Sequence, residues 1–461
     1  MSNLILNNIG LVVTMDDERS ELSNVNIVIR DGIIDKIGVS SDQTQITGVP
    51  TVDMSGYAVF PGLINTHHHL YQTLTRAIPG AQNSGLFEWL RTLYPIWGKM
   101  NGDAVYVSAL VGLAELLLSG CTSSADHLYM YPNGARLDDS IRAAAELGIR
   151  FHPTRGSMSF GESAGGLPPD SLVENEAHIL DDSQRLIEEY HDPEVGSMVQ
   201  IGLAPCSPFS VSSDLMIETA SMARSYGVRL HTHLAETKDE EEFCLERFGK
   251  RPLEYVMDLG WDDDDVWFAH MVHCCNNDIE ALATNGMAIA HCPTSNMRLA
   301  SGIAPIQQML NAGVDMGIGV DGSASNDGGH MLGEVRQAML LARLAGALEE
   351  DQLNIGASNQ YFTARQALEM GTIGGAAALG RNDIGQIQVG KCGDIFAIKM
   401  DKLHYAGGLS DPGAAVLMCA SHNVDLVVVN GNVLVEDGVL RTLDIYEVVE
   451  RHNRISMGLV A

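Results

Sequence analysis

The stretch PGLINTHHHL (residues 61–70) places three consecutive histidines after a Pro-Gly turn and a short apolar run. Short apolar runs that end in polar residues and alternate with helical stretches recur along the chain. Side chains of an extended segment alternate between its two faces. His67 and His69 therefore share one face, and His68 takes the other. The stretch predicts a strand whose far end presents two imidazoles side by side.

Seven more strands of this kind follow, alternating with helical stretches that mostly end in glycine. They are CTSSADH, IRFHPTRG, VQIGLAPCS, VRLHTHLAE, DVWFAHMVH, MAIAHCP and VDMGIGVDG, between residues 121 and 322. Eight strand–helix units predict an α/β fold, a (β/α)₈ TIM-like barrel. A doubly wound open sheet is the alternative. It would want a glycine-rich phosphate-binding turn after its first strand, and the sequence has none there.

The two ends of the chain lack the alternation of strands and helices that marks the middle. NLILNNIGLVVTM (3–15) and DLVVVNGNVLVEDGVL (425–440) are β-branched runs punctuated by turn signals. Neither end carries many strands alone, so we expect residues 1–57 and 384–445 to form one small composite β-sandwich. Residues 58–383 then make the barrel, and residues 446–461 a C-terminal tail.

The composition narrows the range of partners and compartments. The chain has 461 residues and a net charge of −31. A polyanion repels phosphates, which argues against nucleic-acid polymers and anionic membranes. The N-terminus lacks the features of a signal peptide, and no apolar run approaches the roughly 18 residues of a membrane span. The 8 cysteines form no Cys-x-x-Cys pair. We therefore expect a cytoplasmic protein with reduced thiols.

Histidines and an aspartate gather at the predicted carboxyl ends of the strands, the face on which barrels carry active sites. His67 and His69 end the first strand, His231 and His233 lie on the fifth, and Asp321 lies on the eighth. Two imidazoles at i and i+2 can hold a metal between them, and only one of the fifth-strand pair needs to be a ligand. Two or three histidines with one aspartate suit Zn²⁺, with Fe²⁺ as the second option.

These same segments resemble a known family. PGLINTHHH, HTHLAE, FAHMVH, HCPTSN and GVDGSASND, in this order, are similar to the amidohydrolase superfamily over essentially the whole chain. The most similar branch is that of the aminohydrolases of nitrogen heterocycles. Within it, HLAETKDEEEFCLERFGKRP and HCPTSNMRLASGIAP resemble the 8-oxoguanine deaminases, and triazine hydrolases share several of these phrases. The resemblance implies hydrolysis of 8-oxoguanine to urate and ammonia, with an s-triazine aminohydrolase or chlorohydrolase as the alternative.

The resemblance also implies the roles of the site residues. One Zn²⁺ per chain is expected, bound by His67, His69, His233 and Asp321. Glu236 corresponds to the family's proton carrier, and His270 to the histidine that hydrogen-bonds the attacking water, with Asp321 accepting its proton. Binuclear relatives use a lysine near the fourth strand, but VQIGLAPCSPFSVS has none. The remaining histidines near strand ends are expected to serve packing and support: His68, His231, His273 and His291.

Substrate contacts are expected around the same mouth. Guanine deaminases carry a glutamine three residues past the second first-strand histidine, where it contacts the purine edge, and Gln72 matches it. His127, Arg155 and Cys206 lie at or just past strand ends. Trp97 follows the first strand and could stack on a planar ring.

Two other classes of function compete with this interpretation. A cyclic-amide hydrolase is disfavoured by the missing lysine. A non-catalytic binding protein is disfavoured because every expected metal and proton-transfer position is filled. In the favoured class the partner is a small heterocyclic substrate, and the resemblance implies a homo-oligomer.

Overall fold

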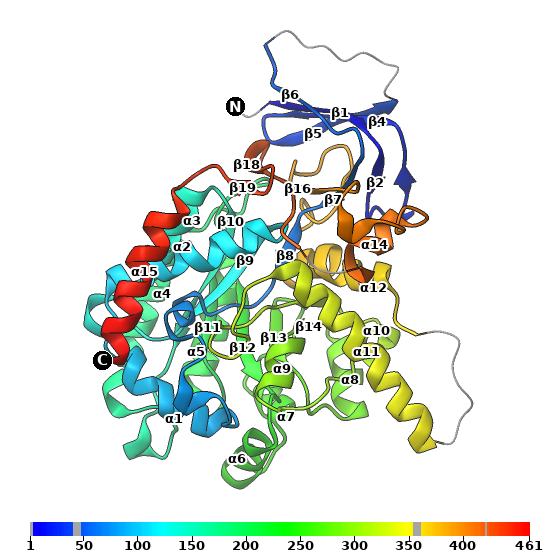
Figure 1. Ribbon diagram of the computed structural model, residues 1–461. Helices are drawn as coiled ribbons and strands as arrows, with labels where there is room; N and C mark the ends of the chain where they lie inside the picture. The colour runs from blue at the N-terminus through cyan, green and yellow to red at the C-terminus, as the bar shows by residue number, and fades with distance from the viewer. Residues whose placement is uncertain (1–2, 40–47, 354–360, 420–421) are drawn as a thin grey trace.

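Eight parallel strands close into a barrel in the computed structural model, which describes residues 3–39, 48–353, 361–419 and 422–461 (Figure 1). The strands are β8 (Leu63–Asn65), β9 (Cys121–Leu128), β10 (Arg150–Ser157), β11 (Gly202–Pro205), β12 (Arg229–Leu234), β13 (Val266–His270), β14 (Ala288–His291) and β15 (Met316–Ile318). All eight coincide with predicted strands and keep their order, so the predicted barrel is confirmed.

Helices connect the barrel strands. They include α1 (Leu86–Trp97), α2 (Gly102–Leu118), α3 (Leu137–Leu147), α4 (Glu176–Tyr190), α5 (Ser213–Tyr226), α6 (Lys238–Phe248), α8 (Asn276–Thr284), α10 (Ile306–Ala312) and α11 (Met331–Leu353). α5 ends at Gly227 with φ of 68°, the left-handed conformation that glycine adopts without a steric penalty. Further on, α12 (Ala364–Glu369), η6 (Met370–Gly374) and α13 (Gly375–Ala378) follow, and η6 and α13 pack against barrel strands.

Two further sheets combine strands from both ends of the chain. One sheet has the order β5 (Ile33–Val39), β4 (Val25–Arg30), β1 (Leu4–Ile9), β6 (Thr51–Asp53). The other runs β19 (Val439–Leu440), β18 (Asn432–Glu436), β17 (Leu426–Val429), β16 (Ile395–Lys399), β7 (Tyr57–Pro61), β2 (Leu11–Val13), β3 (Glu21–Leu22). β7 pairs with β16 along its whole length, so this sheet extends to Pro61, beyond the predicted boundary at residue 57.

The C-terminal tail, for which the sequence analysis predicted no secondary structure, forms a helix. α15 (Ile445–Val460) lies along the barrel beside α2 (Figure 1). His452 and Leu459 on one face are buried. The His452 ring bonds the Thr73 hydroxyl through Nε2 (3.0 Å), and the Ser456 hydroxyl donates to the Leu74 carbonyl (2.6 Å). An amphipathic face that buries side chains against the barrel stabilises this helix.

No helix in the described ranges is long and apolar enough to cross a bilayer.

A buried ion pair joins the barrel to the seven-stranded sheet. Arg150 begins β10, and its Nε and Nη2 donate to Asp394 Oδ2 and Oδ1 at 2.8 and 3.0 Å. Arg150 Nη1 donates to the carbonyls of Gly196 and Ser197. Both side chains of the pair are 2% exposed. Such a pair is costly to break, because the partner left behind is an uncompensated buried charge.

We predict that Arg150→Met destabilises the protein by about 3–5 kcal/mol, the usual effect of removing one partner of a buried pair. Urea-induced unfolding measures this. Arg142→Met is the matched control, because Arg142 is 61% exposed and pairs with Asp139 at the surface, where an ion pair contributes about 1 kcal/mol or less. Equal unfolding midpoints for the two variants would contradict the role of the buried pair.

Candidate active site

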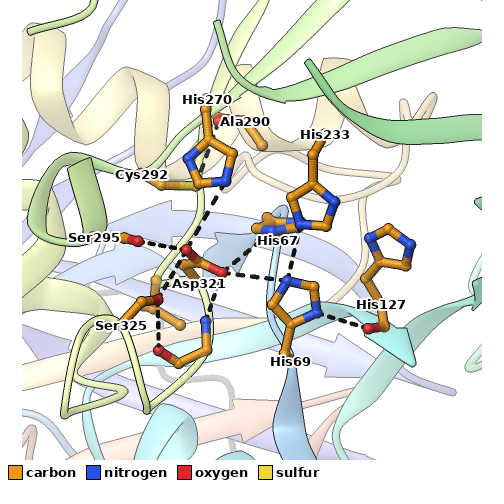
Figure 2. A network of polar contacts seen from close by, with 12 residues as sticks. His67, His69, His127, His233, His270, Ala290, Cys292, Ser295, Asp321 and Ser325 are labelled. Carbon is orange, nitrogen blue, oxygen red and sulfur yellow. Dashed lines mark hydrogen bonds and ion pairs between the residues drawn. The ribbon is translucent and has the colours of Figure 1, made fainter. Parts of the chain in front are cut away.

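The first-strand histidines lie just past the end of β8, which stops at Asn65. Two backbone hydrogen bonds hold this segment to its neighbours. The His67 carbonyl accepts from Asp321 N–H (3.1 Å), and the His68 carbonyl accepts from His127 N–H (2.7 Å). The segment remains extended, and its side chains alternate as predicted. His67 and His69 face the barrel mouth, as Figure 2 shows.

His69 and His233 face each other with two unprotonated ring nitrogens. His69 Nδ1 lies 2.7 Å from the His127 carbonyl, and His233 Nδ1 lies 2.7 Å from the Cys206 carbonyl. A carbonyl only accepts, so each Nδ1 carries the hydrogen. In the neutral rings each Nε2 is therefore a lone pair, yet the two Nε2 atoms lie 3.0 Å apart. Burial and the His69 imidazole lower the pKa of His233 to about 3, which keeps it neutral.

His67 also has an unprotonated Nε2, because its Nδ1 donates to a second histidine, His231. His231 Nδ1 lies 2.8 Å from the Trp267 carbonyl and must donate to it. His231 Nε2 is then the acceptor for His67 Nδ1–H at 2.8 Å. This leaves His67 Nε2 as a buried lone pair with no hydrogen-bond partner in the described part of the chain. His231 also stacks on the Trp267 ring, with centroids 4.4 Å apart, so it supports the ligand nitrogen of His67.

Asp321 brings a carboxylate to the same point. Its Oδ1 lies 3.4 Å from both His67 Nε2 and His69 Nε2. The hydroxyls of Ser295 and Ser325 donate to Oδ2 at 2.5 and 3.0 Å, and these bonds orient the carboxylate (Figure 2).

This donor set fits a small divalent cation. Three neutral imidazole lone pairs and one carboxylate oxygen converge, and none of them can hydrogen-bond another, so the cluster lacks a positive charge at its centre. Three nitrogens and one oxygen are a ligand set that Zn²⁺ takes in four-coordinate sites. The hydrogen bonds to the far ring nitrogens are of the kind that orient metal-ligating histidines.

Glu236 and His270 lie beside this cluster. His270 donates from Nδ1 to the Asn296 side-chain oxygen (2.9 Å), and its Nε2 lies 3.7 Å from Glu236 Oε2 and 3.9 Å from Asp321 Oδ2. Burial alone would lower the pKa of His270, but the two carboxylates raise it. Burial raises the pKa of Glu236. A histidine between two carboxyl groups, one of them outside the ligand cluster, is equipped for proton transfer.

A small cavity borders these groups. Its polar wall includes His69, His233, Glu236, His270 and Asp321, and its apolar wall is formed by Leu86, Trp89, Leu90, Tyr94, Tyr129, Phe209 and Leu299. Among the residues that the structure describes, no lysine or arginine lines it. An aromatic wall without cationic side chains suits a small, flat, uncharged molecule.

Gln72 lines the cavity, and half of its amide is already occupied. Its Oε1 accepts from Ala324 N–H at 3.3 Å, so the NH₂ group is the part left for a ligand. A Cβ at Gly322 would lie 1.9 Å from Oε1, so the approach requires glycine there. The sequence analysis expected Gln72 to contact substrate, and the structure places it on the cavity wall. Cys206, the other expected contact on the cavity wall, lies with its thiol 3.9 Å from His233 Nδ1.

Three expected substrate contacts do not line the cavity. Arg155 forms ion pairs with Glu174 (2.9 Å) and Asp182 (3.1 Å), and its guanidinium lies over the Tyr131 ring. His127 donates from Nε2 to the Ala204 carbonyl (2.9 Å) and stacks on His233, so it supports the ligand cluster from the side. Arg155 and His127 therefore do not reach the cavity wall as expected. His127 Nδ1 has no hydrogen-bond partner among the described residues, and the ring groups with His67, His69 and His233 as a possible metal site.

Trp97 is the third correction. It lies one layer behind the cavity wall, donates to the Thr75 hydroxyl (3.0 Å) and packs edge-on against Trp89. Trp89 is the tryptophan on the wall, and the sequence analysis missed it. α1 (Leu86–Trp97) places Leu86, Trp89, Leu90 and Tyr94 on one face. Their i, i+3, i+4, i+8 spacing is a helical signal that could have identified this wall.

Three of the histidines expected to serve packing and support lie away from the convergent donor set. His68 and His291 are fully buried with no partner for either ring nitrogen among the described residues. His68 Nε2 lies beside Gly112 of α2, away from the cluster. His273 bonds the Ser301 carbonyl through Nε2 (2.9 Å).

Comparison with known proteins agrees with this geometry. Residues 58–434 match the amidohydrolase family, and the chain belongs to it. It is 45% identical to an 8-oxoguanine deaminase from Pseudomonas aeruginosa over 94% of this chain and 95% of the relative. It is 35% identical to a hydroxydechloroatrazine ethylaminohydrolase from Pseudomonas sp. strain ADP over 94% and 91%. These relatives confirm the predicted enzyme class, a hydrolase of the deaminase and aminohydrolase type.

One similar protein of known structure contains zinc. Atrazine chlorohydrolase from Arthrobacter aurescens, complexed with zinc, superimposes with a TM-score of 0.91 at 35% identity, covering 98% of this chain and 100% of that one. A relative of the same fold thus binds zinc, and this chain has a histidine and aspartate cluster that could hold a metal.

We predict that His68→Asn retains its metal, whereas His67→Asn and His69→Asn lose most of it, because alternation turns His68 away from the cluster. Elemental analysis after dialysis measures the content relative to wild type. Equal metal loss in all three variants would show that the segment is not extended as described.

Proposed function

We propose that the protein is a zinc-dependent hydrolytic deaminase whose substrate is 8-oxoguanine, converted with water to urate and ammonia. The observation that carries this proposal is the separation of two carboxyl groups around His270. Asp321 belongs to the convergent donor set, and Glu236 lies outside it. A carboxyl that is not a metal ligand is free to exchange protons. The cytoplasmic location and the homo-oligomeric state remain predictions from the sequence.

One Zn²⁺ per chain would be held by His67, His69, His233 and Asp321. When bound, zinc supplies a Lewis acid that lowers the pKa of a water to about 7. The fourth barrel strand, Gly202–Pro205, carries no lysine, which supports one metal rather than two.

The chain's own residues then move the protons. Asp321 accepts a proton from the attacking water, and His270 helps to orient this water toward the ring carbon that bears the amine. Glu236 donates its proton to the adjacent ring nitrogen, so that this carbon can become tetrahedral. Asp321 then passes the proton of the water to the amine, the C–N bond breaks, and ammonia leaves. The added hydroxyl returns its proton to Glu236 as the carbonyl forms.

The lining of the cavity favours a flat, uncharged base. Its wall is largely apolar and aromatic, and none of the described residues on it is a lysine or arginine, which disfavours a phosphate or carboxylate on the substrate. The Gln72 NH₂ can donate to a carbonyl oxygen or to a ring nitrogen. 8-Oxoguanine offers two carbonyl oxygens, whereas atrazine offers only ring nitrogens and carries bulky alkylamino groups.

We predict that Glu236→Gln keeps its metal and its fold but loses at least about 10²-fold in turnover, the usual contribution of a general acid–base group. Elemental analysis and steady-state kinetics test this together. Loss of zinc in the variant would make Glu236 a ligand and refute its role as the proton carrier.

We predict that turnover, followed as loss of substrate, is fastest with 8-oxoguanine in a panel that includes guanine, isoxanthopterin, cytosine, hydroxyatrazine and atrazine. Substrate loss is the readout because an ethylaminohydrolase releases ethylamine and a chlorohydrolase releases chloride instead of ammonia. Guanine lacks the carbonyl at C8 and should be the weaker purine. Gln72→Ala should reduce kcat/KM for 8-oxoguanine by roughly 1–3 kcal/mol in transition-state binding, the range for a lost buried hydrogen bond.

The same panel separates the rival function. Faster turnover of hydroxyatrazine or atrazine than of every oxopurine would leave a heterocycle hydrolase but replace the purine with a triazine. The similarity to triazine hydrolases makes this the alternative to test first.

A further inference from the structure

A second buried glutamate lies directly behind Glu236, and it rests outside the reaction proposed above. Glu240 is 1% exposed and sits in the first turn of α6 (Lys238–Phe248). Its Oε1 accepts from Ala235 N–H at 3.0 Å, and its Oε2 accepts from Glu236 N–H at 2.9 Å. One carboxylate thus binds two successive backbone amides of the turn that carries the proposed proton carrier.

The bonds of Glu240 differ from ordinary helix capping. An acid at the third position of a helix commonly bonds the backbone N–H of the N-cap residue. Here the N-cap is Thr237, whose hydroxyl accepts from Glu240 N–H at 3.4 Å. The Glu240 carboxylate passes over Thr237 and binds the two amides before it. Those amides lie outside the helix, so the bonds fix the turn rather than the helix end.

The turn needs such a restraint. Ala235 has φ of 52°, a left-handed conformation that side chains other than glycine seldom adopt. Its carbonyl accepts from the N–H groups of Val272 and His273 at 3.0 and 2.9 Å. The turn is therefore held on one side by the loop after β13 and on the other by Glu240.

The side chain of Glu236 has only long contacts of its own. The Ser301 hydroxyl lies 3.4 Å from Oε1, and His270 Nε2 lies 3.7 Å from Oε2. Neither contact is a short, well-formed hydrogen bond. The place of the Glu236 carboxyl therefore depends on where its backbone is held.

We propose that Glu240 is a positioning residue, which sets the location of the Glu236 carboxyl by accepting both amide hydrogens of the Ala235–Glu236 turn. This inference rests on the proposed role of Glu236 as proton carrier. The function requires two acceptor oxygens. A glutamine offers one acceptor and an NH₂ group that faces an N–H, so it cannot replace the carboxylate.

The first test compares Glu240→Gln with Glu242→Gln. Glu242 is exposed on the same helix and undergoes the same chemical change. We expect Glu240→Gln to lower kcat about 10- to 100-fold, the scale of a misplaced catalytic group, with KM within about threefold and with wild-type metal content. Glu242→Gln should match wild type. Unchanged kcat in Glu240→Gln, or a loss caused by missing metal, would overturn the inference.

The second test is a double-mutant cycle. If Glu240 acts through Glu236, the variant Glu236→Gln/Glu240→Gln is no slower than Glu236→Gln alone, because the group being positioned is already gone. Independent, multiplying losses would mean that Glu240 stabilises the fold in general, and would overturn the inference.

A readout without catalysis separates this inference from the proposed function. Hydrogen exchange followed by mass spectrometry should show faster exchange of the segment 234–237 in Glu240→Gln than in wild type or Glu242→Gln. Unchanged exchange would refute the restraint whatever the substrate is. If wild type turned over no member of the panel, the proposed function would fail while the exchange result still decided the structural claim.

Discussion

Three backbone carbonyls decide the chemistry of the barrel mouth. Those of His127 and Cys206 accept a hydrogen from His69 and His233, and that of Trp267 accepts one from His231, which in turn accepts from His67. The three residues lie on β9, just past β11 and on β13, which are alternate strands of the barrel, and the β12–β13 register sets His231 opposite Trp267. The register of a closed barrel therefore dictates which nitrogen of each ring is unprotonated. The Asp321 carboxylate joins an arrangement that the backbone has already imposed.

Two carboxyl groups near His270 acquire different properties from their surroundings. Asp321 receives two hydroxyl donors and faces imidazoles, which favours its charged form. Glu236 receives only long contacts in a buried position, which favours the proton-bearing form. Environments that separate two like groups in this way are characteristic of acid–base sites. The apolar face of α1 lines the same cavity, and an apolar wall lowers the local polarity, which strengthens these electrostatic differences.

The sequence predicts the strands and the ligand cluster, because both depend on local patterns: apolar runs, glycine stops and alternation at strand ends. The cavity wall was harder to predict, because it depends on which partner a side chain meets in three dimensions. The sequence suggested that Arg155 could contact substrate, but in the structure it forms ion pairs with Glu174 and Asp182. Trp97 and Trp89 share one helix, and only packing decides which of them reaches the cavity. The helical structure of residues 445–460 depends on the burial of one face against the barrel helices, a contact that the local sequence does not reveal.

The pairing of the chain ends has a consequence during synthesis. Pro61 of β7 pairs with Ile395 of β16, so the seven-stranded sheet cannot be completed until nearly the whole chain has left the ribosome. At about 10 residues per second this takes roughly three-quarters of a minute. Through that interval the N-terminal strands expose an unpaired edge beside a nascent barrel, and such edges invite association with other chains. The strands from β16 onward cover this edge, and truncated products of translation that lack them leave it exposed.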